Sequence, residues 1–268
     1  MSTALTSPKR SNRPNKMRDP LARGLQLLRW AVQHDRREIG VREAAAALEI
    51  APSTAHQLMT SLVHEGFLRR LETTGGYGLG HELMMLAHKA VQRLPMRDIA
   101  LPHMRALVDS CNEAVFLNIY DRNRQELFAA ASVEADHELR YVVEMYKWKS
   151  LHVSAAGWSI MAQLSDDDRR EIIERSQLSP MTENSITDAA LLEAELEKVR
   201  ARGYACTRGH RILGAVGLSA PIFGIDNHVA GSIGISLPEQ RFSPEVEARL
   251  AGPLMACAQA VTRELTRR

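Results

Sequence analysis

The chain has 268 residues, of which 45% are hydrophobic and 25% charged, and its formal net charge is +2. This length accommodates two domains with buried cores, and the composition is typical of a soluble globular protein. No apolar run approaches the ~20 residues of a membrane span, and the N-terminus has no signal-peptide core. We therefore expect a cytoplasmic protein with no membrane partner. Three widely separated cysteines indicate neither a disulfide framework nor a zinc ribbon.

Positive charge is concentrated near the N-terminus. Residues 1–80 hold 12 Lys and Arg against 7 Asp and Glu, whereas residues 81–268 hold 22 against 25. Within the first range, residues 1–18 carry five basic and no acidic side chains, which predicts a disordered basic tail. Such a tail either enters the minor groove of DNA or only adds solubility, and the sequence leaves both interpretations open.

Residues 19–80 predict a winged helix-turn-helix domain. A helix opens at Pro20, a short Ala-rich helix covers 41–48, and a tight turn leads to a third helix within 51–67. Gly66 ends that helix, and two short strands flanking 73–76 then predict a hairpin, the wing. The first helix is expected to bury the apolar residues that recur at helical spacing, which are Leu21, Leu25, Leu28 and Val32.

The third helix of this domain carries the signal for DNA binding. Its apolar face, which includes Ala55 and Met59, can dock on a small core, while the other face carries short and mostly uncharged polar groups. Hydroxyls near a helix start suit phosphate oxygens, and His and Gln can reach base edges. An ordinary amphipathic helix is the alternative. The residues expected to contact DNA, including two arginines of the wing, are Ser53, Thr54, His56, Gln57, Thr60, Arg69 and Arg70.

Residues 81–94 predict a linker helix, whose many large apolar side chains indicate contact with a partner chain. The second domain is expected over 95–268 and begins with a helix at about 96–109. Alternating apolar residues then predict three antiparallel strands, at 114–120, 126–132 and 139–146. Helices follow at 152–164, 166–176 and 188–202, the last capped by Thr187, and then strands near 215–223 and 228–236 and a final helix from Pro244. This pattern predicts an α+β sensor-like domain.

Three stretches together resemble the IclR family of bacterial transcription regulators: PSTAHQLMTSLVHEGFLRR with GGYGLG, LHVSAAGWSIMAQLSDDD, and EKVRARGYACTRGHRILGAVGLSAPIFG. Their order and spacing cover about residues 20–268. The resemblance implies an α+β chain with an N-terminal winged helix-turn-helix, a linker helix used in dimer contact and a profilin-like or GAF-like effector-binding domain. The resemblance also implies the partners of the chain. These are double-stranded operator DNA, a small organic effector, often a carboxylate or aromatic catabolite, and a second copy of the chain, in homodimers that pair as dimers of dimers.

The resemblance also implies an effector pocket. Small side chains at a helix start can leave N–H groups free for a carboxylate, although close helix–sheet packing is the alternative at each position. The family usually has an acidic run after Gly-Tyr, whereas 206–211 here is cationic, which favours an anionic ligand. The family's usual effector and operator therefore need not transfer. The implied pocket residues, with His210 from the cationic loop, are Leu139, Val142, Ser154, Ala155, Ala156, Thr207, His210, Gly217, Gly234 and Ser236.

No motif predicts catalysis, a metal site or a cofactor. The three His-Glu dipeptides lack the second histidine of a zinc-protease helix, and Ser219 lacks the second glycine of a nucleophile elbow. The acidic run 166–168 suits the positive end of a helix. Cys206 near His210 is the one pair of possible catalytic interest, with a buried thiol as the simpler interpretation. We expect a ligand-responsive regulator, with a small-molecule enzyme carrying an accessory DNA-binding domain, or a constitutive architectural DNA binder, as alternatives.

Overall fold

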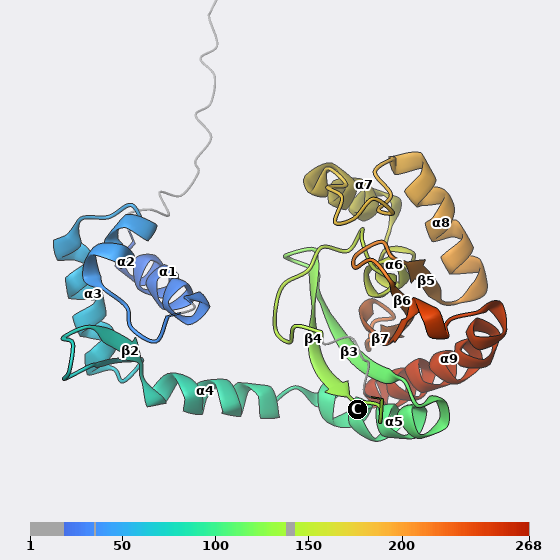
Figure 1. Ribbon diagram of the computed structural model, residues 1–268, viewed down its shortest axis with the longest axis horizontal. Helices are drawn as coiled ribbons and strands as arrows, with labels where there is room; N and C mark the ends of the chain where they lie inside the picture. Colours follow the sequence, from blue (N-terminus) through green and yellow to red (C-terminus); the bar gives the residue numbers. More distant parts are fainter. Residues whose placement is uncertain (1–18, 35, 138–142, 268) are drawn as a thin grey trace, which may run out of the picture. The chain divides into compact units, whose positions relative to one another are not determined.

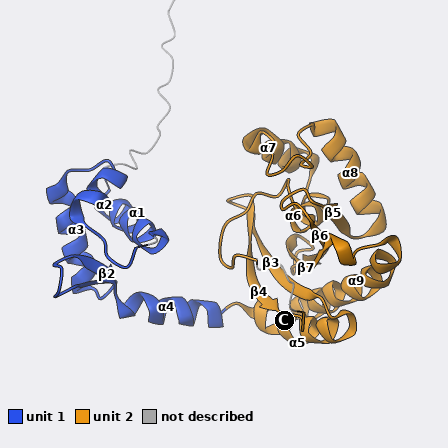
Figure 2. Cartoon of the chain, viewed as in Figure 1, with its two compact units in different colours: residues 1–93 blue, residues 94–268 orange. Residues whose placement is uncertain are grey.

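The computed structural model describes residues 19–34, 36–137 and 143–267 (Figure 1). The chain divides into two compact units, residues 1–93 and 94–268 (Figure 2). The basic tail at 1–18 and the first residues of the strand expected at 139–146 lie outside the described part. None of the helices in that part combines the length and apolar character needed to cross a bilayer.

The first unit is a small helical domain with a two-stranded antiparallel hairpin. Asp19 caps the first helix by accepting a hydrogen bond from the Leu21 N–H, and Gly66, at φ +74°, lets the chain reverse after the third helix. An isolated bridge joins Ile39 to Tyr77 of the hairpin. The elements are α1 (Pro20–Gln33), α2 (Val41–Ala47), α3 (Pro52–His64), β1 (Leu68–Arg70), β2 (Tyr77–Leu79) and α4 (His81–Gln92).

The buried face of α1 differs from the expected one. Leu27 and Ala31 enter the core with Met59 of α3, whereas Leu25 is 55% exposed and Leu21 and Val32 are also exposed. The segment is rich in leucine, so two overlapping stripes both have helical spacing, and periodicity alone cannot choose between them. Packing against α3 decides the matter in favour of Leu27. The predicted core stripe of α1 was therefore wrong.

The second unit is built on a five-stranded antiparallel sheet in the order β4-β3-β7-β6-β5. Helices α5 and α9 pack on one face of the sheet, and α6 lies on the other face with α8 beside it (Figure 1). The elements are α5 (Pro95–Cys111), β3 (Ala114–Asp121), β4 (Glu126–Val133), α6 (Ala155–Met161), α7 (Asp166–Ser176), α8 (Ala189–Arg202), β5 (Ala205–Arg208), β6 (Ala215–Phe223), β7 (Val229–Pro238) and α9 (Pro244–Thr266), with a 3₁₀ turn at Glu239–Arg241.

Successive side chains of β6 point alternately to the two faces of this sheet. Val216 and Leu218 join the core beneath α5 and α9, whereas Ser219 points to the other face and accepts a hydrogen bond from Ser159 of α6, with an Oγ–Oγ distance of 3.2 Å. Gly217 lies on the same face as Ser219, because a Cβ added there would lie 3.4 Å from the Cβ of Ala155. The face beneath α6 therefore carries small residues, and the opposite face carries large apolar ones.

Several local predictions for this unit need correction. The described end of the expected strand at 139–146 forms only an isolated parallel bridge, between Met145 and Ala129. The cap of α8 is Asp188 rather than Thr187, because the carboxylate of Asp188 accepts the Leu191 N–H at 2.9 Å. The strand β5, which the sequence did not predict, adds an edge to the sheet.

The helix expected at 152–164 is also shorter than predicted. Its cap, Ser154, has an extended backbone and accepts the Gly157 N–H on its side chain, so the helix cannot begin earlier. At its other end the helix stops at Met161, and residues 162–164 separate it from the capping residue of α7, Ser165, whose side chain accepts the Asp168 N–H. The predicted helices at 166–176 and from Pro244 are confirmed.

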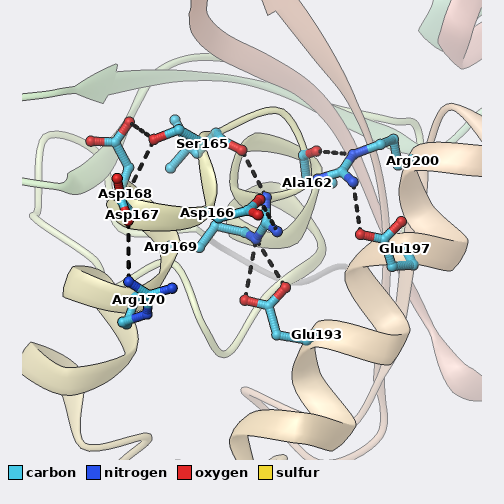
Figure 3. Close-up of polar contacts among 11 residues, drawn as sticks. Ala162, Ser165, Asp166, Asp167, Asp168, Arg169, Arg170, Glu193, Glu197 and Arg200 are labelled. Atoms are coloured by element: carbon cyan, nitrogen blue, oxygen red, sulfur yellow. Dashed lines mark hydrogen bonds and ion pairs between the residues drawn. The ribbon is translucent and has the colours of Figure 1, made fainter.

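Hydrogen bonds from a buried arginine of α7 link this helix to α8 (Figure 3). The Nε of Arg169 donates to both carboxylate oxygens of Glu193, at 3.2 and 2.9 Å, and its Nη2 donates to Asp166 at 2.9 Å. Beside it, Arg200 of α8 donates from Nε to the Ala162 carbonyl at the end of α6, at 2.9 Å. The helices around the sheet are thus joined by charge-assisted hydrogen bonds as well as by apolar packing.

Neighbouring arginines of α7 allow a matched test of this network. Replacing Arg169, whose side chain is 6% exposed, with Ala should lower the free energy of unfolding by about 3 kcal/mol, because Glu193 loses its partner and a cavity remains. Replacing Arg170, which is 67% exposed and pairs with Asp167, should change it by less than about 0.5 kcal/mol. Urea unfolding of both variants measures the difference. Equal effects would contradict the structural role of Arg169.

Candidate functional site

Helix α3 presents a polar face to solvent. It buries Ala55 and Met59 in the core of the first unit, and the opposite side chains are exposed except Thr54, which is half-buried. Two hydroxyls bond back to the helix, since Thr60 Oγ donates to the His56 carbonyl at 2.9 Å and Ser61 Oγ to the Gln57 carbonyl at 3.1 Å. These hydroxyl oxygens keep lone pairs for a donor. The exposed residues of the predicted set on this helix are Ser53, His56, Gln57 and Thr60.

The two wing arginines differ in their surroundings. Both lie exposed on β1, where Arg69 is paired with Gly78 and Arg70 with Tyr77 in the register of the hairpin. Arg70 donates to the Tyr77 hydroxyl at 3.4 Å, and its guanidinium lies over the tyrosine ring, 5.4 Å from the centroid. This contact orients Arg70 along the wing.

A cavity of about 160 Å³ lies in the second unit, on the face of the sheet that carries α6. Residues of strands β3, β4, β5, β6 and β7 form its floor, the start of α6 forms one wall, and segments 143–149 and 210–212 complete the lining. Leu139 and Val142, which were also expected here, lie outside the described residues. The expected residues that line the cavity are Ser154, Ala155, Ala156, Thr207, His210, Gly217, Gly234 and Ser236.

Glycine residues give this cavity its floor. A Cβ added to Gly217 would lie 3.4 Å from the Cβ of Ala155 and 3.5 Å from the Thr207 hydroxyl, and one on Gly234 would lie 3.5 Å from the Asn118 amide nitrogen. The sequence left two roles open for Gly217, close packing of α6 on the sheet and lining of a cavity. In the structure Gly217 has both. A side chain at either glycine would occupy space that the cavity now uses.

The first turn of α6 already uses most of its amides. The Ala155 N–H donates to the Thr207 hydroxyl at 3.2 Å, and the Gly157 N–H donates to the Ser154 hydroxyl at 3.2 Å. The Trp158 N–H donates to the Ser154 carbonyl at 2.8 Å. Among the described residues, the Ala156 N–H of this turn has no acceptor, so the turn offers one amide to a ligand rather than several.

Two cations also line the cavity, and neither belongs to the predicted set. Lys149 is 8% exposed and Arg211 is half-buried, and within the described ranges no carboxylate forms an ion pair with either one, although the exposed Glu144 of the lining acts on both through its charge. Burial, and then the charge of Arg211, lower the pKa of Lys149 to about 8. Burial also lowers the pKa of Arg211. The cavity is therefore positively charged at neutral pH.

The sequence offered only part of the signal for these cations. Arg211 lies in the cationic run 206–211, which was recognised without Arg211 being assigned to the pocket. Lys149 lies after the expected strand 139–146, in a segment without periodicity. Its backbone exchanges hydrogen bonds with Leu127 of β4, at 2.8 and 3.0 Å, and this pairing carries it to the cavity. Only the tertiary pairing reveals its position.

Cys206 of β5 and His210 of the loop that follows it face different sides of the sheet. Cys206 packs toward the core beneath α9, where burial raises the pKa of its thiol to about 12. His210 lines the cavity on the other side and lies edge-on to Trp158, with ring centroids 5.0 Å apart, and burial lowers its pKa. A protonated, half-buried thiol that faces away from His210 is a poor nucleophile, so the pair gives no catalytic arrangement.

Acidic and sulfur side chains give no further site. In the part of the chain that the structure describes, no group of three or more His, Cys, Asp or Glu residues could hold a metal ion. The acidic run 166–168 instead lies at the first turn of α7, where Asp166 and Asp167 pair with arginines of the same helix.

Family models match both units of the chain. Residues 88–263 match the bacterial transcriptional regulator IclR C-terminal model, and residues 20–72 match the IclR helix-turn-helix domain. The chain belongs to the IclR family. It is an IclR-type DNA-binding transcriptional regulator, with an N-terminal helix-turn-helix domain and a C-terminal IclR effector domain of mixed helix and sheet.

Individual relatives cover nearly the whole chain. The transcriptional repressor IclR of Escherichia coli is 26% identical over 90% of this chain and 88% of its own length. The glycerol operon regulatory protein of Streptomyces griseus is 29% identical over 91% and 95%. The Thermotoga maritima IclR structure superposes with a TM-score of 0.73 at 26% identity, over 92% of this chain and 98% of that one.

A further solved structure holds a ligand. It is an IclR homologue from Microbacterium hydrocarbonoxydans in complex with 4-hydroxybenzoate, and it is similar to this IclR-family chain with a TM-score of 0.79 over 93% of this chain and 100% of that one. Its sequence identity is 22%, so the likeness establishes a common fold.

Side chains on α3 and on the wing should affect DNA binding in different ways. Replacing Gln57 or His56 with Ala should relax preference at one base pair by about 1–3 kcal/mol, since a base contact is lost. Replacing Arg69 with Ala should weaken all sequences alike, because a phosphate contact carries no sequence information. Competition binding against operator variants distinguishes the two results. Unchanged preference in both α3 variants would show that α3 does not contact the bases of the operator.

Proposed function

We propose that this regulator senses a small organic carboxylate, of the class of short-chain or aromatic catabolites, in the cavity beside α6. Binding there changes the affinity of α3 and the wing for operator DNA. The observation that carries the proposal is the presence of two cations, Lys149 and Arg211, in a cavity where no carboxylate pairs with them in the described structure. Buried charge without a partner is costly, and an anionic ligand removes that cost.

The size and lining of the cavity support this class of ligand. About 160 Å³ is close to the ~150 Å³ cavity that accommodates benzene in another protein. Phe116, Leu127 and Ile212 supply apolar surface, while the Thr207 and Ser236 hydroxyls can add hydrogen bonds. The 4-hydroxybenzoate held by the Microbacterium homologue is itself an aromatic carboxylate.

We further infer that the protein binds a near-palindromic operator as a homodimer and pairs as a dimer of dimers. Helix α4 has no buried residue, although Met84, Met85 and Leu86 all belong to it. The exposed Leu21 and Leu25 of α1 extend the apolar surface of the first unit. Large apolar side chains in such number on one unit favour a second copy as the partner.

Filling the cavity should separate ligand sensing from DNA binding. Ala155 is 4% exposed at the cavity wall, so Ala155→Leu places methyl groups in the space that a ligand needs. Isothermal titration with 4-hydroxybenzoate, benzoate and short-chain carboxylates should show binding to the wild type and none to the variant. Operator affinity without ligand should be unchanged, because the first unit has its own core.

Two controls accompany this titration. Ala190→Leu adds the same atoms at an exposed position of α8 and should leave ligand binding intact. Ligands recovered after incubation should be chemically unchanged, and conversion to a product would instead support the enzyme alternative. Equal affinity of Ala155→Leu and wild type for the same ligand would show that the effector binds elsewhere.

A further inference from the structure

The charge of the cavity exceeds what one carboxylate neutralises. Lys149 and Arg211 both line it, and the pKa of Lys149 is lowered first by burial and then by the charge of Arg211. Glu144 is the acidic residue of the lining, and its charge partly offsets the fall in the pKa of both cations. Its side chain is exposed, however, and accepts a hydrogen bond from Lys147 at 2.8 Å instead of pairing with Lys149 or Arg211. A ligand with a single negative charge would therefore leave one desolvated cation without compensation.

Backbone contacts hold both cations in place before any ligand arrives. Lys149 is fixed by its paired hydrogen bonds with Leu127 on β4. The loop that carries Arg211 is held by two hydroxyls, since Thr182 donates to the Gly209 carbonyl at 2.6 Å and Ser185 donates to the His210 carbonyl at 2.6 Å. These contacts fix the backbone that carries both cations, so binding need only order their side chains.

We propose that the effector is a compact dicarboxylate, bound as the dianion with Lys149 and Arg211 together neutralising its two carboxylates. This inference rests on the proposed function and narrows its ligand class. The dianion removes both uncompensated charges, and a planar guanidinium suits a carboxylate particularly well. A phosphate ester carries similar charge but is usually held by several backbone amides, and the first turn of α6 offers one.

The protonation of Lys149 gives this proposal a characteristic pH dependence. The charged groups around it are Arg211, Glu144 and Lys147, and with burial they bring its pKa to about 8 in the free protein. His210, which also lines the cavity, has a lowered pKa and is neutral well before Lys149 loses its proton. Raising the pH from 7 to 9 should therefore weaken dicarboxylate binding about tenfold, because a proton must be taken up at Lys149.

The experiment compares ligands that differ only in charge. Succinate and succinamate, and phthalate and phthalamate, are titrated calorimetrically into the full chain at pH 7, with phenyl phosphate as a third type of anion. Wild type should bind the better dicarboxylate at least tenfold more tightly than its monoamide. Lys149→Met and Arg211→Met should each reduce this preference to less than threefold, whereas Lys198→Met, which alters an exposed lysine of α8 outside the cavity lining, should retain it.

The outcomes separate this inference from the proposed function. Equal binding of a dicarboxylate and its monoamide, with both lost in Ala155→Leu, would leave the carboxylate-sensing function standing and overturn the dianion. Tighter binding of phenyl phosphate than of any dicarboxylate would also overturn it. If the cavity variants do not fold, the preference of wild type for a dicarboxylate over its monoamide decides the question of the dianion. The pH profile then tests Lys149: a tenfold loss between pH 7 and 9 supports its role, and a flat profile contradicts it.

Discussion

The packing of α6 against the segment that precedes it, and against the sheet below, is the constraint on which the cavity depends. A Cβ on Gly157 would lie 1.8 Å from the Leu151 carbonyl oxygen, so only glycine permits the chain to pass there. Trp158 adds a second contact between α6 and the same segment, because its indole N–H donates to the His152 carbonyl at 2.7 Å. With α6 held in this position, Gly217 lies below Ala155 without a side chain, and a cavity remains where a continuous core would otherwise form.

Buried charged groups have different partners inside the cavity and elsewhere in this domain. Away from the cavity, buried charge is compensated: Arg169 is bound by two carboxylates, and Glu113 is held by two hydrogen bonds from Arg241, at 2.7 and 2.8 Å. Inside the cavity, Lys149 and Arg211 have no such partners among the described residues. Proteins retain uncompensated charge of this kind chiefly where a ligand completes it. This contrast favours a binding site over a structural defect.

The sequence predicted those features that depend on neighbours along the chain. The alternation in 114–121, the serine and proline that open α9, and the polar face of α3 are local signals, and each corresponds to the expected element. Features that depend on tertiary packing were not predictable. The burial of Leu27 rather than Leu25 is decided by α3, and the position of Lys149 by its pairing with β4. Gly217 and Ala155 could be assigned to the pocket only through the family resemblance.

Reciprocal coupling between ligand and operator is the sharpest test of whether this cavity controls DNA binding. Operator affinity is measured with and without a saturating ligand, and ligand affinity is measured with and without saturating operator. The account predicts the same factor in both directions, typically about 5–150-fold, and a factor of one for both in Ala155→Leu. A ligand that binds the cavity but leaves operator affinity unchanged would contradict the account.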